Sequence, residues 1–457
     1  MKGSPLFQYL YIFYTFVFTL HIANIFIEHE TLNYMIGVFA LIMLVVSFIG
    51  ASRLFLILSV SFLTVGAYLF WTTGESVSVI PSIITSNLSL LTLLAMLPWM
   101  NSVVRSGRFD RSLNTLMRAN VSDLGKLYTR GSGTTLTLAA FLNLSAVSIS
   151  QEVLKRNLAP VDRKVRNAFI SASTLRGFSL AVLWSPLEIL VALPIFLTGV
   201  SYVSIFPWLL LVAVITFTLD SIWGRYYFKK YTYQATDVNE PEEVSTKGLG
   251  GKIFHLAGAL VLFLALVIIG GTLFEIDFIL TVTLLIFPFT LIWSVIMKRL
   301  RSFWAIGWNT WKEKTNTMQN FVILFISLSF FSYSISSAAF LDVIQKPILY
   351  VSEYPLLVFF VIQVLFIGLS MFGIHPVATL GILGSLISTL LTVYNPLSIA
   401  IVLVTSAIAT LTVGTYGLVV TLTAMSLEQS PYRITLMNLA YAFIFGGIGT
   451  LIAYFLL

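Results

Sequence analysis

Long apolar runs separated by short polar turns make up most of the chain. Four such runs open the sequence, at 6–27, 33–50, 53–72 and 82–104. Each is long enough for a membrane-spanning helix, which takes about 20 apolar residues. Further runs of this kind lie at 203–223, 253–272, 276–297, 318–343 and 433–457. The pattern predicts an all-α polytopic membrane protein.

One semi-polar run, from Gly131 to Leu154, carries basic residues on both flanks. They are Lys126, Arg130, Lys155, Arg156, Arg163, Lys164 and Arg166. Because Lys and Arg near membrane segments are retained on the cytoplasmic side, a single crossing does not fit two basic flanks. A re-entrant hairpin fits them, because both of its ends lie on the same side of the membrane. Its centre at 143–148 is small and rich in hydroxyls, which suits a turn at membrane depth inside protein or beside a water-filled cavity.

Two later spans are interrupted. The run 166–197 contains Arg176-Gly177 and then Trp184-Ser185-Pro186, and the run 396–426 contains the sequence TVGTYG at 412–417. Pro and Gly inside a spanning helix leave backbone groups that need other partners. Both runs are therefore predicted to be discontinuous helices.

A second hairpin is expected at 355–392, where glycines and His375-Pro376 interrupt the run and basic flanks are missing. The order of hairpin, broken span and closing span thus occurs twice. Ser145 precedes Gly373 by 228 residues, and Ser185 precedes Val413 by the same number. The opposite flank charges indicate an inverted repeat of the secondary-transporter kind, with about 11 transmembrane helices and two re-entrant hairpins. The alternative is a plain bundle of spans.

These signals divide the chain into four parts. Residues 1–84 form N-terminal membrane helices, and 85–224 form the first repeat unit with its cytoplasmic-side hairpin. A polar cytoplasmic linker at 225–252 precedes the second half at 253–457, which holds the inverted unit and an outer-side hairpin. The N-terminus is expected in the cytoplasm and the C-terminus outside.

Two amphipathic stretches lie outside the spans. Apolar residues recur at helical spacing among charges within 108–127, which predicts a helix lying at the membrane interface. Trp304, Trp308 and Trp311 precede Lys312 and Lys314. Tryptophan favours interfacial depth and lysine the cytoplasmic side, so this segment is also placed at the inner surface.

Composition agrees with this picture. The chain has 457 residues, of which 58% are hydrophobic and 10% charged, whereas about a quarter is charged in soluble domains. Its net charge of +7 arises from clusters between apolar runs, as orientation signals do, so nucleic acid is not an expected partner. Cysteine is absent from the sequence, which excludes a disulfide framework and a thiolate nucleophile.

From residue 85 onward, the order of segments in the chain resembles that of a known superfamily. The features that carry the resemblance are the run from Leu90 to Arg111, the hairpin, the Ser185-Pro186 break and the segment Thr198-Gly199-Val200-Ser201. They are similar to the ion transporter superfamily, which includes divalent-anion/sodium symporters, citrate carriers, arsenite permeases and the large subunit of tripartite carboxylate transporters. The resemblance covers residues 85–457 in two copies.

This resemblance implies a secondary transporter with two paired hairpins in an elevator-like core. Many members of the superfamily are dimers through their scaffold, so the resemblance also implies a homodimer. Members with known substrates often have a Ser-Asn-Thr type tip in each hairpin. The corresponding places here hold Asn143-Leu144-Ser145 and Gly373-Ile374-His375-Pro376.

Three ionisable residues are candidates for the site. Arg176 lies inside the first broken span, where an ionised side chain faces a cavity or a partner, so it is a candidate for binding an anionic solute. The alternatives are a structural ion pair with Glu188 and an extension of the side chain to the inner surface. Glu188 is itself a candidate proton carrier or a residue near the outer surface. His375, in the second hairpin tip, is a candidate for proton coupling or a hydrogen-bonded structural histidine.

Small and hydroxyl-bearing residues complete the candidate site. Hydroxyls, amides and exposed backbone at unwound helices can coordinate ions or solute oxygens. The candidates of this kind are Asn143, Ser145, Ser148, Ser185, Gly373, Thr412, Gly414 and Thr415. For any one of them the alternative is helix packing. No cofactor or metal is expected, apart from a coupling Na⁺ or H⁺.

One enzyme interpretation remains. The zinc-protease, phosphate-loop and nucleophile-elbow motifs are missing from the sequence. Glu28-His29-Glu30 and the pair Glu275 and Asp277 lie at turns on the outer side, where a membrane glycosyltransferase or polymerase would hold acids and a metal. Such enzymes usually also have a sizeable outer loop, whereas the outer loops expected here are short, so surface charge at these loops is the alternative for both groups. The sequence therefore predicts a non-enzymatic secondary transporter of a small anionic solute in a prokaryotic plasma membrane.

Overall fold

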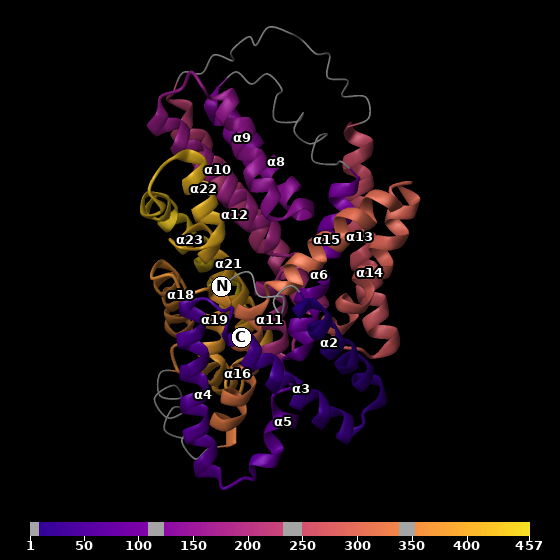
Figure 1. The fold of residues 1–457 in the computed structure, drawn as a ribbon. Coiled ribbons are helices and arrows are strands. Elements are labelled where there is room, and N and C mark those ends of the chain that lie inside the picture. Colours follow the sequence, from indigo (N-terminus) through magenta and orange to yellow (C-terminus); the bar gives the residue numbers. More distant parts are fainter. Residues whose placement is uncertain (1–8, 108–122, 232–248, 338–351) are drawn as a thin grey trace. The chain divides into compact units, whose positions relative to one another are not determined.

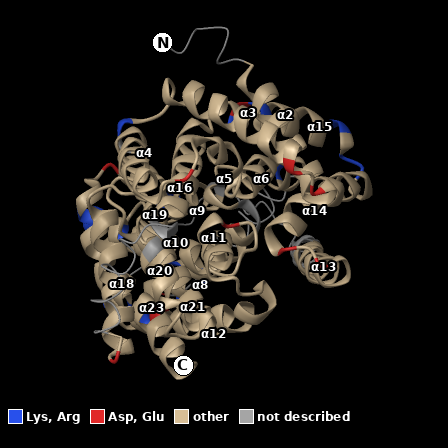
Figure 2. Ribbon diagram, turned by 90° about the horizontal axis from the view of Figure 1, so that it is seen from below, with Lys and Arg blue, Asp and Glu red and all other residues tan. Residues whose placement is uncertain are grey.

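The structure is a computed structural model that describes residues 9–107, 123–231, 249–337 and 352–457. Every regular element in these ranges is a helix (Figure 1). Seven of these helices are long and apolar enough to cross a membrane, and an eighth span is formed if one bent pair counts as one. Lys, Arg, Asp and Glu positions are sparse along the described helices (Figure 2). The predicted all-α membrane architecture is confirmed, whereas the full number of spans stays a prediction.

The described helices form two compact units, each assembled from separate stretches of chain. The first unit comprises Met1–Ser106, Gly270–Glu353 and Gly381–Val393. Its helices are α2 (Leu10–Ile27), α3 (Glu30–Phe48), α4 (Arg53–Thr73), α5 (Ile80–Ile83), α6 (Leu88–Ser106), α14 (Phe278–Ile296), α15 (Leu300–Asn316), α16 (Gln319–Ser337) and α20 (Gly384–Leu390). Within it α4 packs on α16, and α6 packs on both α14 and α15.

The second unit comprises Gly107–Ile269, Tyr354–Leu380 and Tyr394–Leu457. Its helices from the first half are α8 (Leu124–Leu142), α9 (Leu144–Asn157), α10 (Arg163–Val182), α11 (Ile189–Thr198) and α12 (Tyr202–Lys229). Those from the second half are α18 (Pro355–Met371), α19 (Pro376–Ile382), α21 (Pro396–Ala409), α22 (Leu418–Leu427) and α23 (Pro431–Phe455). Helix α13 (Leu249–Phe274) runs from the second unit into the first. The units are interleaved along the chain, and the predicted linear division into repeat halves stays a prediction.

A single residue separates the two helices of the first hairpin. Asp123 caps α8 by accepting the Lys126 backbone N–H at 2.8 Å, and Asn143 ends the helix with φ 48°. Its ψ is −132°, so this positive-φ conformation lies outside the left-handed helical region and turns the chain sharply. The next residue begins α9, which packs back on α8. The turn lies at the start of the predicted centre, 143–148. Entry and exit of the hairpin on one side of the membrane stay a prediction.

Only one of the two interruptions expected in the first broken span is present. Helix α10 continues unbroken through Arg176 and Gly177, contrary to the expectation that this pair interrupts it. Gly177 serves packing instead, because a Cβ there would lie 2.5 Å from the Ser132 carbonyl oxygen of α8. The helix ends at Val182, and α11 begins at Ile189 after Pro186.

The second half repeats this order of elements. Helix α18 is followed by a turn in which Gly373 has φ +91°, and α19 starts at Pro376. Asn395 caps α21 by accepting the Leu397 N–H at 3.0 Å. A 3₁₀ turn, η3 (Thr410–Thr412), and the irregular residues 413–417 then separate α21 from α22, as predicted. The opposite orientation of the two copies stays a prediction.

Two predicted polar segments are described only in part. The expected interfacial helix within 108–127 falls mainly on residues 108–122, outside the described residues. Of the expected linker at 225–252, helix α12 takes up the first residues as far as Lys229, and α13 begins at Leu249. Residues 232–248 lie outside the described residues.

Candidate functional site

The turn of the first hairpin faces the break in the helix that follows it. Glu188 is the last residue of that break and precedes α11 directly. The side-chain amide of Asn143 interacts with the Glu188 carboxylate. Ser185, in the same break, accepts the Leu187 backbone N–H on its hydroxyl oxygen at 3.3 Å. Three of the predicted site residues therefore meet at one place.

The turn between α18 and α19, in the predicted second hairpin, lies close to the second break. A Cβ added at Gly373 would lie 3.1 Å from the Tyr416 Cδ2 atom. A Cβ added at Gly414 would lie 2.7 Å from the Ser370 hydroxyl oxygen of α18. Glycine at both positions allows this close approach of turn and break. In each half of the chain the hairpin turn thus contacts the interruption of the broken helix that follows.

The two broken helices also contact each other within the second unit. Helix α11, which follows the first break, packs on α21, which precedes the second. Helix α10 contacts η3. Irregular backbone from both halves is therefore gathered in one unit, as it is at the solute and ion sites of many secondary transporters.

The predicted hydroxyl residues have different surroundings. Thr412 is buried and donates to the Ala409 carbonyl at 2.9 Å, and Thr415 pairs with the Thr435 hydroxyl at 3.1 Å. Ser148 lies on an exposed part of α9, apart from the buried groups of the breaks. Ser145 belongs to α9, and its side chain is outside the described part of the structure.

His375 stands at the start of α19. Its Nδ1 atom accepts the Val377 backbone N–H at 3.2 Å. The imidazole therefore takes the role of a helix N-cap, and the proton of a neutral ring is carried on Nε2. This contact fits the structural interpretation of His375, because protonation would have to occur on Nδ1 and would remove the bond from Val377.

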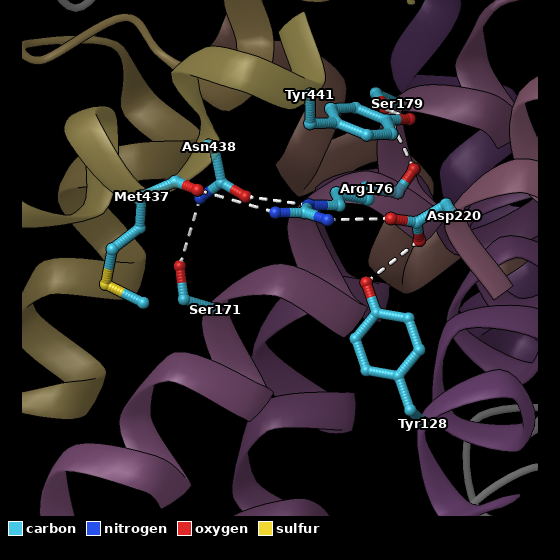
Figure 3. A network of polar contacts seen from close by, with 8 residues as sticks. All are labelled: Tyr128, Ser171, Arg176, Ser179, Asp220, Met437, Asn438 and Tyr441. Carbon is cyan, nitrogen blue, oxygen red and sulfur yellow. Dashed lines mark hydrogen bonds and ion pairs between the residues drawn. The ribbon is translucent and has the colours of Figure 1, made fainter. Parts of the chain in front are cut away.

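Arg176 lies in a buried polar network in the second unit (Figure 3). Its Nη1 atom is 2.7 Å from Oδ1 of Asp220 on α12. Its Nε donates to Asn438 of α23 at 3.0 Å, and its Nη2 donates to the Met437 carbonyl at 3.4 Å. The guanidinium carbon also lies 4.5 Å from the centroid of the Trp223 ring.

The network extends on both sides of this ion pair. Tyr128 of α8 donates its hydroxyl to Asp220 Oδ2 at 2.9 Å, and Asn438 donates to the Ser171 hydroxyl at 3.3 Å (Figure 3). Arg176 thus has the structural ion pair that was one of its predicted alternatives, but the acid is Asp220 rather than Glu188. A solute anion would have to replace Asp220 to reach the guanidinium.

Three buried polar residues, Asp220, Thr379 and Ser406, were not among the site residues predicted from the sequence. Asp220 lies within the predicted span 203–223, and a lone carboxylate inside a span marks a functional or structural partner. That signal was sufficient to single it out. Thr379 and Ser406 are fully buried, and their hydroxyls have no hydrogen-bond partner in the structure. Serine and threonine are common in packed membrane helices, so the sequence alone does not distinguish these two.

The groups behind the enzyme alternative have local roles. Asp277 caps α14 by accepting the Ile279 and Leu280 backbone N–H groups at 2.9 and 3.1 Å. Glu28 ends α2 in the left-handed conformation with φ 52°. Within the described ranges, His, Asp and Glu side chains do not form a group of three that could hold a metal ion.

Comparison with known proteins identifies the fold. Neither a protein-family model nor a curated protein sequence matches the chain. The YdaH transporter of Alcanivorax borkumensis, described as having an unusual topology, is similar in structure with a TM-score of 0.62 and 13% identity. The similarity covers 88% of this chain and 97% of YdaH.

A second solved structure agrees. MtrF of Neisseria gonorrhoeae, assigned to a class of antimetabolite efflux pumps, has a TM-score of 0.55 and 12% identity. The similarity covers 90% of this chain and 96% of MtrF. Both are transporters, which agrees with the predicted transporter fold and with the expectation of a non-enzyme. The placement in the ion transporter superfamily stays a prediction.

Proposed function

We propose that the protein is a secondary transporter that carries a small anionic, carboxylate-like solute across the plasma membrane by alternating access. The observation that carries this proposal is the pairing of each hairpin turn with the break of the following helix. Asn143 contacts Glu188 in one half, and Gly373 approaches Tyr416 in the other. Discontinuous helices that meet in this way form the solute and ion sites of many secondary transporters.

In this proposal the two repeat units of the chain have opposite orientations in the membrane. The protein as a whole belongs to the ion transporter superfamily. The backbone N–H groups at the start of α22 would attract the anionic group of the solute, because helix N-termini carry partial positive charge. Those of Ile189 and Leu190 at the start of α11 already face the Glu188 carboxylate. Asn143, Ser185, Thr412, Gly414 and Thr415 would supply further polar contacts. The N-terminus would lie in the cytoplasm, the C-terminus outside, and two copies would form a dimer.

Glu188 is the proposed coupling group. It is the carboxylate at the first break, and it lies beside the hairpin turn that alternating access would move. Protonation or Na⁺ binding there would neutralise one charge at the site. An anionic solute would then bind more favourably, which couples its flux to that of the cation.

The test is transport by the reconstituted full chain. Proteoliposomes would be given a panel of organic anions, with sodium and proton gradients imposed separately and in both directions. Outward-directed flux is measured as well because MtrF is an efflux pump. Glu188→Gln is expected to abolish the gradient-driven component of flux, whereas the matched change Glu152→Gln, at an exposed pair with Arg156 on α9, is expected to retain it. Full coupled flux in Glu188→Gln would refute the role of Glu188, and the lack of any anion flux would refute the function.

His375 can be tested without loss of its capping contact. Asparagine also accepts a backbone N–H at a helix N-terminus, so His375→Asn is expected to preserve the start of α19. It removes the imidazole, the side chain that would have to accept a coupling proton. If His375 carried the coupling proton, the proton-driven component of flux would be lost in this variant, and the sodium-driven component would not.

A further inference from the structure

Helix α15 in the first unit has two faces of different character. Phe303, Gly307 and Trp311, at four-residue spacing, are buried and pack against Trp99 of α6. The Trp99 and Phe303 ring centroids are 5.4 Å apart, and a Cβ on Gly307 would lie 2.5 Å from Trp99 Cζ3. This face anchors α15, so the direction of its other side chains is set by helix geometry.

The other face presents an aromatic groove. Trp304 is 48% exposed and Trp308 is 42% exposed, and their rings are stacked with an interplanar angle of 13°. Together with Ala305 and Asn309 they line a groove of about 230 Å³. Because a helix turns once in 3.6 residues, Arg301, Trp304 and Trp308 lie on one stripe.

The surroundings of the groove are cationic. Five basic residues and one acid, Glu313, lie within 298–314, and the basic residues are Lys298, Arg299, Arg301, Lys312 and Lys314. Lys312 already stacks on Tyr11, with its Nζ 5.1 Å from the ring centroid. Arg301, at the other end of the stripe, is exposed. An apolar groove one helical turn away from an exposed cation complements an acyl chain joined to an anionic headgroup.

We propose that this groove binds an anionic phospholipid. One acyl chain lies across Trp304 and Trp308, and the phosphate pairs with Arg301. Tryptophan is favoured at the depth where acyl chain and headgroup meet, and a juxtamembrane basic cluster attracts anionic lipid. The groove residues belong to the first unit and none of them is part of a hairpin or a break, so this proposal does not depend on the proposed transport function.

The experiment uses the intact protein in vesicles that contain brominated phosphatidylglycerol or brominated phosphatidylcholine at equal mole fraction. Bromine quenches a tryptophan that it contacts. We expect the intrinsic fluorescence to be quenched more by the phosphatidylglycerol. The excess quenching is expected to vanish in the Trp304→Phe/Trp308→Phe variant and to persist in Trp71→Phe, a matched control at an 85% exposed tryptophan on α4.

The charge is tested separately. Arg301→Gln is expected to lower the preference for phosphatidylglycerol about fivefold, the change expected for one basic residue near an anionic surface. Arg301→Lys is expected to retain it, which distinguishes loss of charge from loss of fold. Equal quenching of the wild-type protein by both lipids, or an unchanged preference in Arg301→Gln, would overturn the proposal.

Discussion

Arg176 and Asp220 form a buried ion pair, with 2.7 Å between the guanidinium Nη1 and the carboxylate Oδ1. The pair joins α10 to α12, and Asn438 extends the contact to α23. Helices from both halves of the chain are therefore held together at one polar point inside the second unit. Removing either partner leaves a buried charge without its counter-ion.

Asp220→Asn should be strongly destabilising for that reason. The expected loss is about 3–5 kcal/mol, as for other buried pairs from which one member is removed. Thermal unfolding followed by tryptophan fluorescence measures the effect. The matched control is Glu428→Gln at the exposed Arg163–Glu428 pair, where the loss should be below about 1 kcal/mol. Equal midpoints for the two variants would contradict the structural role of Asp220.

The contact between Gly414 and Ser370 predicts a rescue. Gly414→Ala places a methyl group 2.7 Å from the Ser370 hydroxyl, so overpacking should cost about 1–3 kcal/mol. Removing that hydroxyl in Ser370→Ala/Gly414→Ala should recover most of the loss, as measured by the unfolding midpoint. Gly368→Ala, with no atom within 4 Å of the added Cβ, should cause no loss. A double variant less stable than Gly414→Ala would show that the clash lies elsewhere.

Gln151 links the first hairpin to helices of both halves. Its Nε2 atom donates to Thr174 of α10 at 3.2 Å and to Thr423 of α22 at 2.8 Å. Gln151→Met should cost only about 1–2 kcal/mol, because both threonine hydroxyls keep their own backbone acceptors. Unfolding midpoints compared with Ser148→Ala, on the exposed side of α9, test this value. A loss of stability as large as that in Asp220→Asn would mean that Gln151 makes stabilising contacts beyond these two hydrogen bonds.

The two hairpins can be located by labelling, since the sequence contains no cysteine to give a background. Lys126→Cys and Arg156→Cys should both react with a membrane-impermeant thiol reagent from the cytoplasmic side only. Glu353→Cys and Thr392→Cys should both react from the outside. Labelling of Lys126→Cys and Arg156→Cys from different sides would show that α8 and α9 are not a re-entrant hairpin, whatever their packing.

Local patterns predicted the elements well. The apolar run at 276–297 became α14, and the sequence TVGTYG at 412–417 coincides with the break between η3 and α22. Run length and the special backbone needs of Gly and Pro act within a few residues, so they can be recognised without tertiary information. The predicted interruption at Gly177 was wrong, because α10 continues through this residue. Glycine also permits close helix packing, and only the neighbouring Ser132 carbonyl shows that this role applies.

The sequence by itself determined that the chain enters a membrane, which segments are helical and where two of them are interrupted, because these properties depend on composition over short windows. Only the tertiary structure decided that Arg176 pairs with Asp220 and that Asn143 contacts Glu188. Each pair joins residues 44 or 45 positions apart, on different helices for Arg176 and Asp220 and in a turn and a break for Asn143 and Glu188. Which faces of the elements meet depends on the packing of the whole unit, and a local sequence pattern does not predict this pairing.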